Sequence, residues 1–312
     1  MKLLLLKLIH SIFIPMFLPA GICIALLAKR TNRPINPRLV WGEAPIINNV
    51  YWSNAMEKYG YQSETFTDDY CSTINTRKDY GKIVQDMYGA IPLSFKYYIA
   101  FLHSLFCYDV FFTSFNGFFL GKTSLWRFES FLLNLAGKKI VIIPFGLDAY
   151  VYRRIRSPAL THGLLSSISR PSRTQREISR RVDYWCKNAN CVMPGFMGPD
   201  GLGRWDVLTP SPLVIDLDTW KVSSRENMHD GVSGSVVVAH APNHRGFKGS
   251  EFVSEAIRML KMEGLQIEFK LIEGVQNNEV RRILEEEADI LVEQLIFPGH
   301  GLNGTVLKIE HQ

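Results

Sequence analysis

The stretch from Ser235 to Ser250, SVVVAHAPNHRGFKGS, joins a short apolar run to a loop rich in glycine and cations. Its valine run, 236–238, is typical of a strand that is buried on both faces of a parallel sheet. A helix is predicted from Gly249 to Glu263, because Gly264 follows as a stop signal. A strand, a loop and a helix in this order indicate an α/β unit. Ligands of such units bind at the carboxyl ends of the strands, so we expect the loop to carry a site.

The same alternation is found in two blocks of the chain. In the first block, a helical stretch from Leu125 to Leu135 precedes the apolar strand Lys139–Pro144. In the second, the strand Gln266–Ile272 precedes a helix over Asn277–Glu287. Alternating strands and helices predict parallel sheets. We therefore expect an α/β fold with two Rossmann-like parallel-sheet domains, one over residues 36–222 and one over residues 232–312.

The first 35 residues have a different character. No charged side chain occurs from Leu8 to Ala28. A run of about 20 apolar residues is long enough for a helix to span a bilayer. Pro15 and Pro19 interrupt its hydrogen bonding and favour a kinked or re-entrant segment. We expect residues 1–35 to be an apolar, helical, membrane-associated segment with a linker; a helix buried in a soluble protein and a signal peptide are the alternatives.

Composition narrows the class of protein. The chain has 312 residues, with 35 Lys and Arg against 30 Asp and Glu, so its net charge is +5. This mild excess permits an anionic partner. The five cysteines include no CxxC pair, which argues against a disulfide scaffold or a zinc site, and we predict no metal. The arginine-rich stretch 153–181 is either a solvated surface or one that faces lipid headgroups. No aromatic residues interleave with its arginines as in nucleic-acid binding modules, so no nucleic acid is expected.

The loop after the valine run suits a diphosphate. Arg245 and Lys248 supply two cations, and Gly246 and Gly249 allow the backbone to approach a ligand closely. The helix that follows presents unpaired N–H groups at its N-terminus. The alternative is a polar loop capped by Ser250.

The region 236–304 resembles the donor-binding domain of GT-B glycosyltransferases, specifically the family-4-like enzymes of surface-polysaccharide clusters. The resemblance rests on the loop 240–250 and on the tracts 271–275 and 288–295. In the first half, Gly42-Glu43-Ala44-Pro45 resembles the first loop, which faces the acceptor. Phe145-Gly146-Leu147-Asp148 resembles the family's His-Gly-Ser-Asp tract, with Phe145 where His is usual.

The resemblance implies retaining transfer of a sugar from a nucleotide-sugar donor, with no cofactor and no metal. Cations and helix N-termini then stabilise the departing diphosphate. It implies Asp148 as a catalytic residue, Gly42 and Glu43 on the acceptor side, and the donor-binding residues Arg245, Lys248, Gly249, Gly301, Gly304 and Glu310. The expected partners are the donor, a lipid-linked or oligosaccharide acceptor and membrane lipid. The expected place is the cytoplasmic face of the inner membrane, in surface-polysaccharide biosynthesis.

Two departures from the family pattern bear on activity. Glu310 matches the second Glu of the family's Glu-x7-Glu pattern, but Leu302 stands where the first is expected. The chain ends at Gln312, where the family continues with further strands and helices, so we expect the second domain to be incomplete. The alternatives to an active transferase are a truncated, non-catalytic, membrane-anchored remnant and a nucleotide-sugar epimerase of the same architecture.

Overall fold

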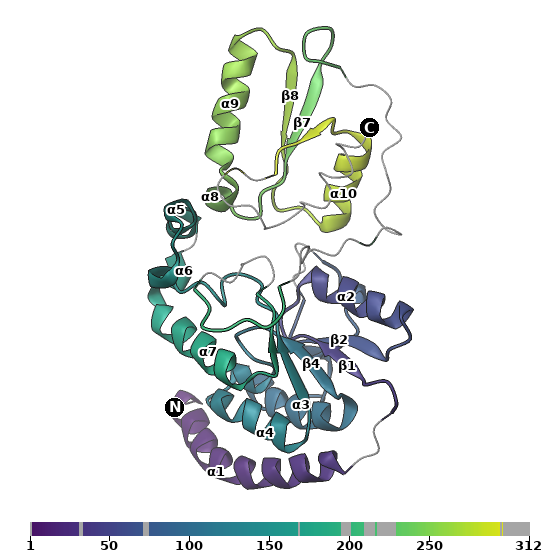
Figure 1. Ribbon diagram of the computed structural model, residues 1–312, viewed down its shortest axis with the longest axis vertical. Helices are drawn as coiled ribbons and strands as arrows, with labels where there is room; N and C mark the ends of the chain where they lie inside the picture. The colour runs from purple at the N-terminus through teal and green to yellow at the C-terminus, as the bar shows by residue number, and fades with distance from the viewer. Residues whose placement is uncertain are drawn as a thin grey trace.

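The computed structural model describes residues 2–30, 34–70, 75–167, 169–194, 201–208, 216, 229–293 and 295. Within these residues it contains two separate parallel sheets, each flanked by helices (Figure 1). The α/β class and the two parallel sheets predicted from the sequence are therefore confirmed. The predicted boundary between the domains falls largely outside the described residues.

The first sheet has the strand order β3-β2-β1-β4-β5-β6, and every described pair in it is parallel. Its strands are β1 (Leu39–Trp41), β2 (Ser63–Thr67), β3 (Lys82–Ile83), β4 (Val110–Thr113), β5 (Lys139–Ile142) and β6 (Cys191–Val192). Val40, Phe111 and Ile140 lie in register on the three central strands and are fully buried. This order is the doubly wound one, in which the direction of winding reverses between β1 and β4.

Helices connect the strands of this sheet. They are α2 (Ile47–Lys58), α3 (Leu93–Cys107), α4 (Glu129–Leu135), α5 (Pro158–Ser167), α6 (Ser169–Arg173) and α7 (Gln175–Asn188). Short 3-10 turns occur at η1 (Arg77–Asp79), η2 (Val84–Asp86), η3 (Leu120–Lys122), η4 (Trp126–Phe128) and η5 (Tyr152–Arg154). The single helix predicted over Leu125–Leu135 is thus divided into η4 and α4.

The second sheet is smaller, with the order β8-β7-β9 and parallel pairing. Its elements are β7 (Val236–His240), α8 (Arg245–Lys248), α9 (Ser250–Met262), β8 (Ile267–Leu271), α10 (Asn277–Glu286) and β9 (Ile290–Leu291). Gly249 separates α8 from α9 with φ +70°, a left-handed conformation that glycine adopts without steric cost. The strand, loop and helix predicted over 235–263 are confirmed. Helix α5 packs against α8 and so links the two units (Figure 1).

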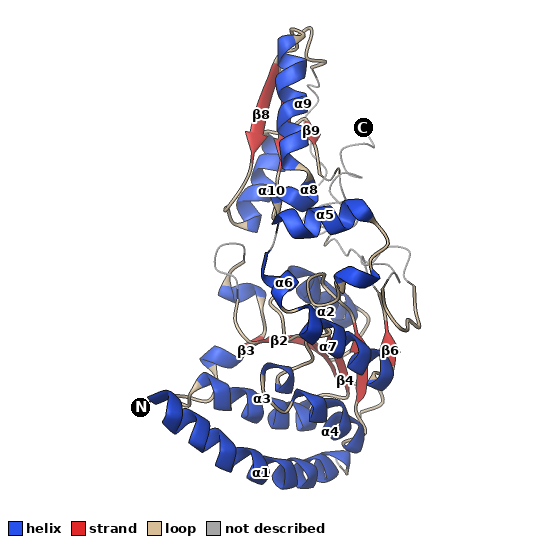
Figure 2. Cartoon of the chain, turned by 90° about the vertical axis from the view of Figure 1, so that its left-hand side faces the viewer, coloured by secondary structure: helices blue, strands red, loops and turns tan. Residues whose placement is uncertain are grey.

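The N-terminal segment is the helix α1 (Lys2–Lys29), which continues through Pro15 and Pro19. It curves beneath α3 and α4 and packs against both (Figure 2). The Phe17 ring lies edge-on to Tyr98, with ring centroids 4.7 Å apart, and Gly21 allows close contact with Leu132. The predicted helix is present and continues through both prolines, whereas its association with a membrane stays a prediction. Among the described residues, no helix combines the length and apolar character needed to cross a membrane.

Candidate functional site

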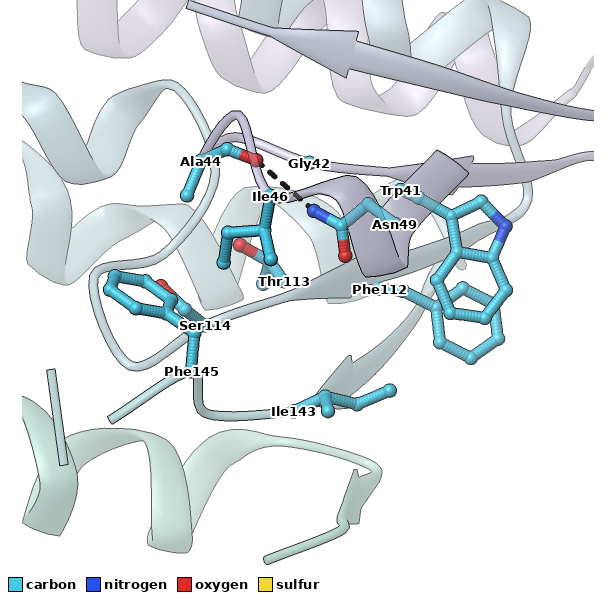
Figure 3. Close-up of a pocket in the computed structure, with 10 residues that line it drawn as sticks. All are labelled: Trp41, Gly42, Ala44, Ile46, Asn49, Phe112, Thr113, Ser114, Ile143 and Phe145. Carbon is cyan, nitrogen blue, oxygen red and sulfur yellow. Dashed lines mark hydrogen bonds between the residues drawn. The ribbon is translucent and has the colours of Figure 1, made fainter. Parts of the chain in front are cut away.

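A pocket lies at the carboxyl ends of β1, β4 and β5 (Figure 3). The winding of the sheet reverses between β1 and β4, so the loops after these strands diverge and leave a crevice there. It is a small crevice that is partly open to solvent. The residues that line it are Trp41, Gly42, Ala44, Ile46, Asn49, Phe112, Thr113, Ser114, Ile143 and Phe145.

The pocket lining combines apolar side chains with the polar side chains of Asn49, Thr113 and Ser114. The rings of Trp41 and Phe112 stack with their centroids 3.8 Å apart and their planes 10° from parallel. The Asn49 amide donates a hydrogen bond of 3.1 Å to the Ala44 carbonyl and so holds the loop after β1 (Figure 3). Apolar walls with a small number of placed polar groups are typical of small-molecule sites.

Gly42 is the first residue after β1. A Cβ at this position would lie 2.1 Å from the Phe66 carbonyl oxygen and 3.2 Å from the Phe118 ring. The position therefore requires glycine because another backbone passes against it. Gly42 also lines the pocket, which is compatible with its predicted place on the acceptor side; that role stays a prediction.

Glu43 belongs to a buried charge cluster beside the pocket. Its side chain is fully buried, and its Oε2 lies 2.5 Å from Lys122 Nζ, which lies 3.0 Å from Asp68 Oδ2. Burial raises the pKa of Glu43 to about 7, although the nearby Lys122 opposes this shift. Burial alone lowers the pKa of Lys122, but Glu43 and Asp68 outweigh it and the net shift is upward. Lys122 and Asp68 remain partly exposed, so the cluster reaches the surface through them.

Asp148, the predicted catalytic residue, is buried in the same region. Its carboxylate accepts hydrogen bonds from the backbone N–H groups of Phe115, Phe145 and Gly146, at 2.9, 3.1 and 2.9 Å. Burial raises the pKa of Asp148 to about 6, and these hydrogen bonds oppose the shift. The carboxylate thus ties the loop after β4 to the loop after β5, and it positions the pocket wall. A direct role in catalysis stays a prediction.

Two side chains that sequence reasoning missed hold the loop after β4. Buried Glu129 accepts hydrogen bonds from the N–H groups of Phe118 and Gly121, at 2.5 and 2.6 Å. Arg181 donates to the carbonyls of Asn116 and Gly121, at 2.7 and 3.1 Å. These contacts fix the turn that presents Lys122. No sequence signal points to Glu129, since its partners are backbone N–H groups, which side-chain patterns do not reveal.

The basic stretch 153–181 therefore contains arginines of two kinds. Arg181 and Arg154 make internal contacts, the latter with Asp183 at 2.8 Å. Exposed arginines of the same stretch are Arg153, Arg156, Arg173, Arg176 and Arg180. Among the arginines whose side chains the structure describes, this second group is placed to meet an external anion.

The second candidate site is the loop after β7. His240 is fully buried, with Nδ1 2.6 Å from the Val292 carbonyl and Nε2 2.8 Å from Ser250 Oγ. A carbonyl can only accept, so Nδ1 carries the proton and Nε2 accepts from the serine hydroxyl. Burial lowers the pKa of His240, which favours this neutral form. Its role is to join β7 to the start of α9 and to the end of β9. No group of three metal-ligating side chains occurs in the part of the chain that the structure describes.

The structure separates the two cations predicted to bind a diphosphate. The side chain of Arg245 is 62% exposed and is paired with Glu273, with Nη2 2.5 Å from Oε2. Lys248 is buried and pairs with Glu293, and its pKa is lowered by burial although Glu293 opposes the shift. An exposed pair can be exchanged for another anion at little cost, whereas breaking a buried pair is expensive. Arg245 is therefore the better placed of the two to bind a phosphate.

Of the remaining donor-side residues, the structure describes one and leaves three undescribed. Gly249 lies in the loop after β7, between α8 and α9. Gly301, Gly304 and Glu310, and the departure at Leu302, lie outside the described residues. No family model matches the chain, and no curated protein matches it.

Proposed function

We propose that the chain transfers a sugar from a nucleotide-sugar donor to a saccharide acceptor, at a membrane surface on the cytoplasmic side. The observation that carries the proposal is the placement of the two candidate sites. Each lies at the carboxyl end of a central strand, β1 or β7, where the order of the strands reverses. Open parallel sheets bind their ligands at such points. Two of them in one chain suit a reaction between two substrates.

On the donor side, the loop 240–249 would receive the nucleotide diphosphate. Arg245 is the cation that faces solvent there, and a guanidinium can bond two phosphate oxygens at once. During transfer, the bond between the anomeric carbon and the diphosphate breaks and negative charge collects on the leaving group. A fixed cation stabilises that charge, as the reaction requires when no metal takes part.

On the acceptor side, the pocket beside β1 would receive the saccharide. Its apolar wall suits the face of a sugar ring, and Asn49, Thr113 and Ser114 supply polar groups for sugar hydroxyls. The acceptor hydroxyl oxygen forms the new bond to the anomeric carbon, and with retention its proton passes to the departing diphosphate. Asp148 supports this pocket by holding the loops after β4 and β5.

One observation favours a second candidate, a protein that binds a saccharide or a partner without transfer. Both cations of the second site already have carboxylate partners, Glu273 and Glu293. A diphosphate would have to displace at least the first of these carboxylates.

The test is transfer from radiolabelled UDP-, GDP-, ADP- and CMP-sugars to a membrane-lipid extract and to soluble oligosaccharides. The proposal expects a labelled product with one donor, and at least about tenfold less of it with Arg245→Ala, since a hydrogen bond to a charged group contributes about 1.5–3 kcal/mol. Arg258→Ala is the matched control, because Arg258 is also exposed and carboxylate-paired but lies on the side of α9. No product with any donor, from a folded sample that still binds saccharide, would establish the second candidate.

A further inference from the structure

We propose that the outer face of α1 binds an anionic lipid bilayer, with the helix lying in the plane of the membrane surface. This role of α1 rests on the proposed function, because that function takes place at a membrane surface. It adds the face that binds, the orientation of the helix and the charge of the lipid.

The inner face of α1 is already occupied by the protein. Phe17, Ala25 and Ala28 are buried on it, and Gly21 meets Leu132 of α4. The Phe13 ring lies 5.1 Å from Phe95 and 5.0 Å from Tyr98, centroid to centroid. From Phe13 to Ala28 the helix is held in this way on one side, and its opposite side is left for another partner.

The outer face of α1 is apolar and exposed over three turns. Met16 is 68% exposed, and Leu27 is 56% exposed. Other exposed residues on this face are Pro15, Pro19, Ala20, Cys23 and Leu26. No charged residue interrupts the face. Phe128 and Phe131, on η4 and on the α4 helix that supports α1, are exposed as well. Seven exposed apolar residues on one face of a helix mark a docking site.

Charge identifies the partner. No acidic residue precedes Glu43, whereas the first 42 residues carry six cations: Lys2, Lys7, Lys29, Arg30, Arg33 and Arg38. Arg38 is paired with Asp109, but Lys29 and Arg30 are exposed where α1 ends. A second copy of this face would bring like charges together. Anionic headgroups complement it, since apolar faces flanked by Lys and Arg bind such lipids.

The arrangement of the layers supports binding in the plane of the membrane. Helix α1 forms the outermost layer at one end of the molecule, and the second sheet lies at the opposite end (Figures 1 and 2). A bilayer on this face therefore leaves the second sheet free of lipid. The loop after β7 lies at the end of the second sheet that faces the first unit, next to α5 (Figure 1), so the first sheet separates it from a membrane on α1.

The test is flotation of the full chain with phosphatidylcholine vesicles, with and without about 30% phosphatidylglycerol. We expect the chain to float with the anionic vesicles, and Met16→Glu/Leu27→Glu to weaken partitioning at least about tenfold. Lys29→Glu/Arg30→Glu should weaken it similarly, on anionic vesicles only. Phe252→Glu/Met262→Glu, which changes two exposed apolar residues of α9, is the matched control and should float normally.

Three results would overturn the inference, each with cooperative thermal unfolding as the check of folding. The first is binding to neutral vesicles as strong as binding to anionic vesicles. The second is flotation of Met16→Glu/Leu27→Glu like that of the parent chain. The third is no flotation of the parent chain with either kind of vesicle. If the chain then sediments as a dimer that Met16→Glu/Leu27→Glu dissociates, the face binds a second copy. Nucleotide binding measured on the same sample separates the two proposals, because α1 variants should leave it unchanged. Vesicle binding without sugar transfer would contradict the proposed function alone.

Discussion

Lys248 and Glu293 form an ion pair inside the second unit, with the lysine side chain 1% and the glutamate side chain 6% exposed. A buried charge that loses its partner costs about 3–5 kcal/mol, whereas an apolar replacement of both partners is often neutral. We therefore predict that Lys248→Met lowers the free energy of unfolding of this unit by about 3–5 kcal/mol, and that Lys248→Met/Glu293→Leu restores most of it. Urea unfolding of the full chain measures both.

The opposite pattern would give Lys248 a different role. If Lys248→Met has the same free energy of unfolding as the parent chain but no longer binds nucleotide, then Lys248 binds the diphosphate in place of Glu293, as the sequence predicts.

The pair Arg245–Glu273 lies on the surface, so its variants should affect binding rather than stability. Glu273→Gln removes a carboxylate that competes with phosphate for the guanidinium. We expect nucleotide affinity to rise several-fold, with the free energy of unfolding changed by less than about 1 kcal/mol. Calorimetric titration and urea unfolding give the two numbers. Weaker nucleotide binding in this variant would show that Glu273 itself contacts the ligand.

Substitution of Gly42 tests how closely the backbone of β2 approaches the loop after β1 beside the pocket. A methyl group there would overlap the Phe66 carbonyl, so Gly42→Ala should destabilise the first unit by about 1–3 kcal/mol or more. Gly203→Ala is the control, because a Cβ at that position meets no atom within 4 Å and the backbone is not in the left-handed region. Thermal unfolding of both variants is the measurement. Equal melting temperatures would contradict the close approach of the two strands.

The raised pKa of Glu43 predicts that the free energy of unfolding falls as the pH rises. Its pKa in the folded protein is about 7, against an ordinary value of 4.5, so the folded state binds the proton more tightly than the unfolded state. The stability it contributes is present below pH 4.5 and is lost as the pH rises through about 7. Glu43→Gln should flatten the fall of the unfolding free energy across this window, while the exposed Glu57→Gln should not. An unchanged slope in Glu43→Gln would show that Glu43 is ionised throughout.

Local sequence patterns predicted the strands and helices well. Runs of valine and isoleucine indicate strands, and a glycine ends a helix, through effects that extend over only a few residues. The strand at 236–240 and the helix that ends before Gly264 are examples. The contacts that shape the sites depend on distant pairing, which such patterns do not contain. Lys248 meets a partner 45 residues away, and no spacing rule predicted that this cation is buried.

The N-terminal helix illustrates the same limit. Apolar content and length alone do not distinguish a helix that crosses a bilayer from one that packs on a protein. The stripe formed by Phe17, Gly21, Ala25 and Ala28 packs because α3 and α4 present apolar surface to it. That complementary surface is a property of the folded chain.

The proposed function depends most on the binding of a nucleotide diphosphate to the loop after β7 through Arg245. Its most direct test is calorimetric titration of the full 312-residue chain with UDP, GDP, ADP and CMP. We expect saturable binding of one nucleotide, weakened at least about tenfold by Arg245→Ala and unchanged by Arg258→Ala. No saturable binding of any of the four, in a sample that unfolds cooperatively, would contradict it.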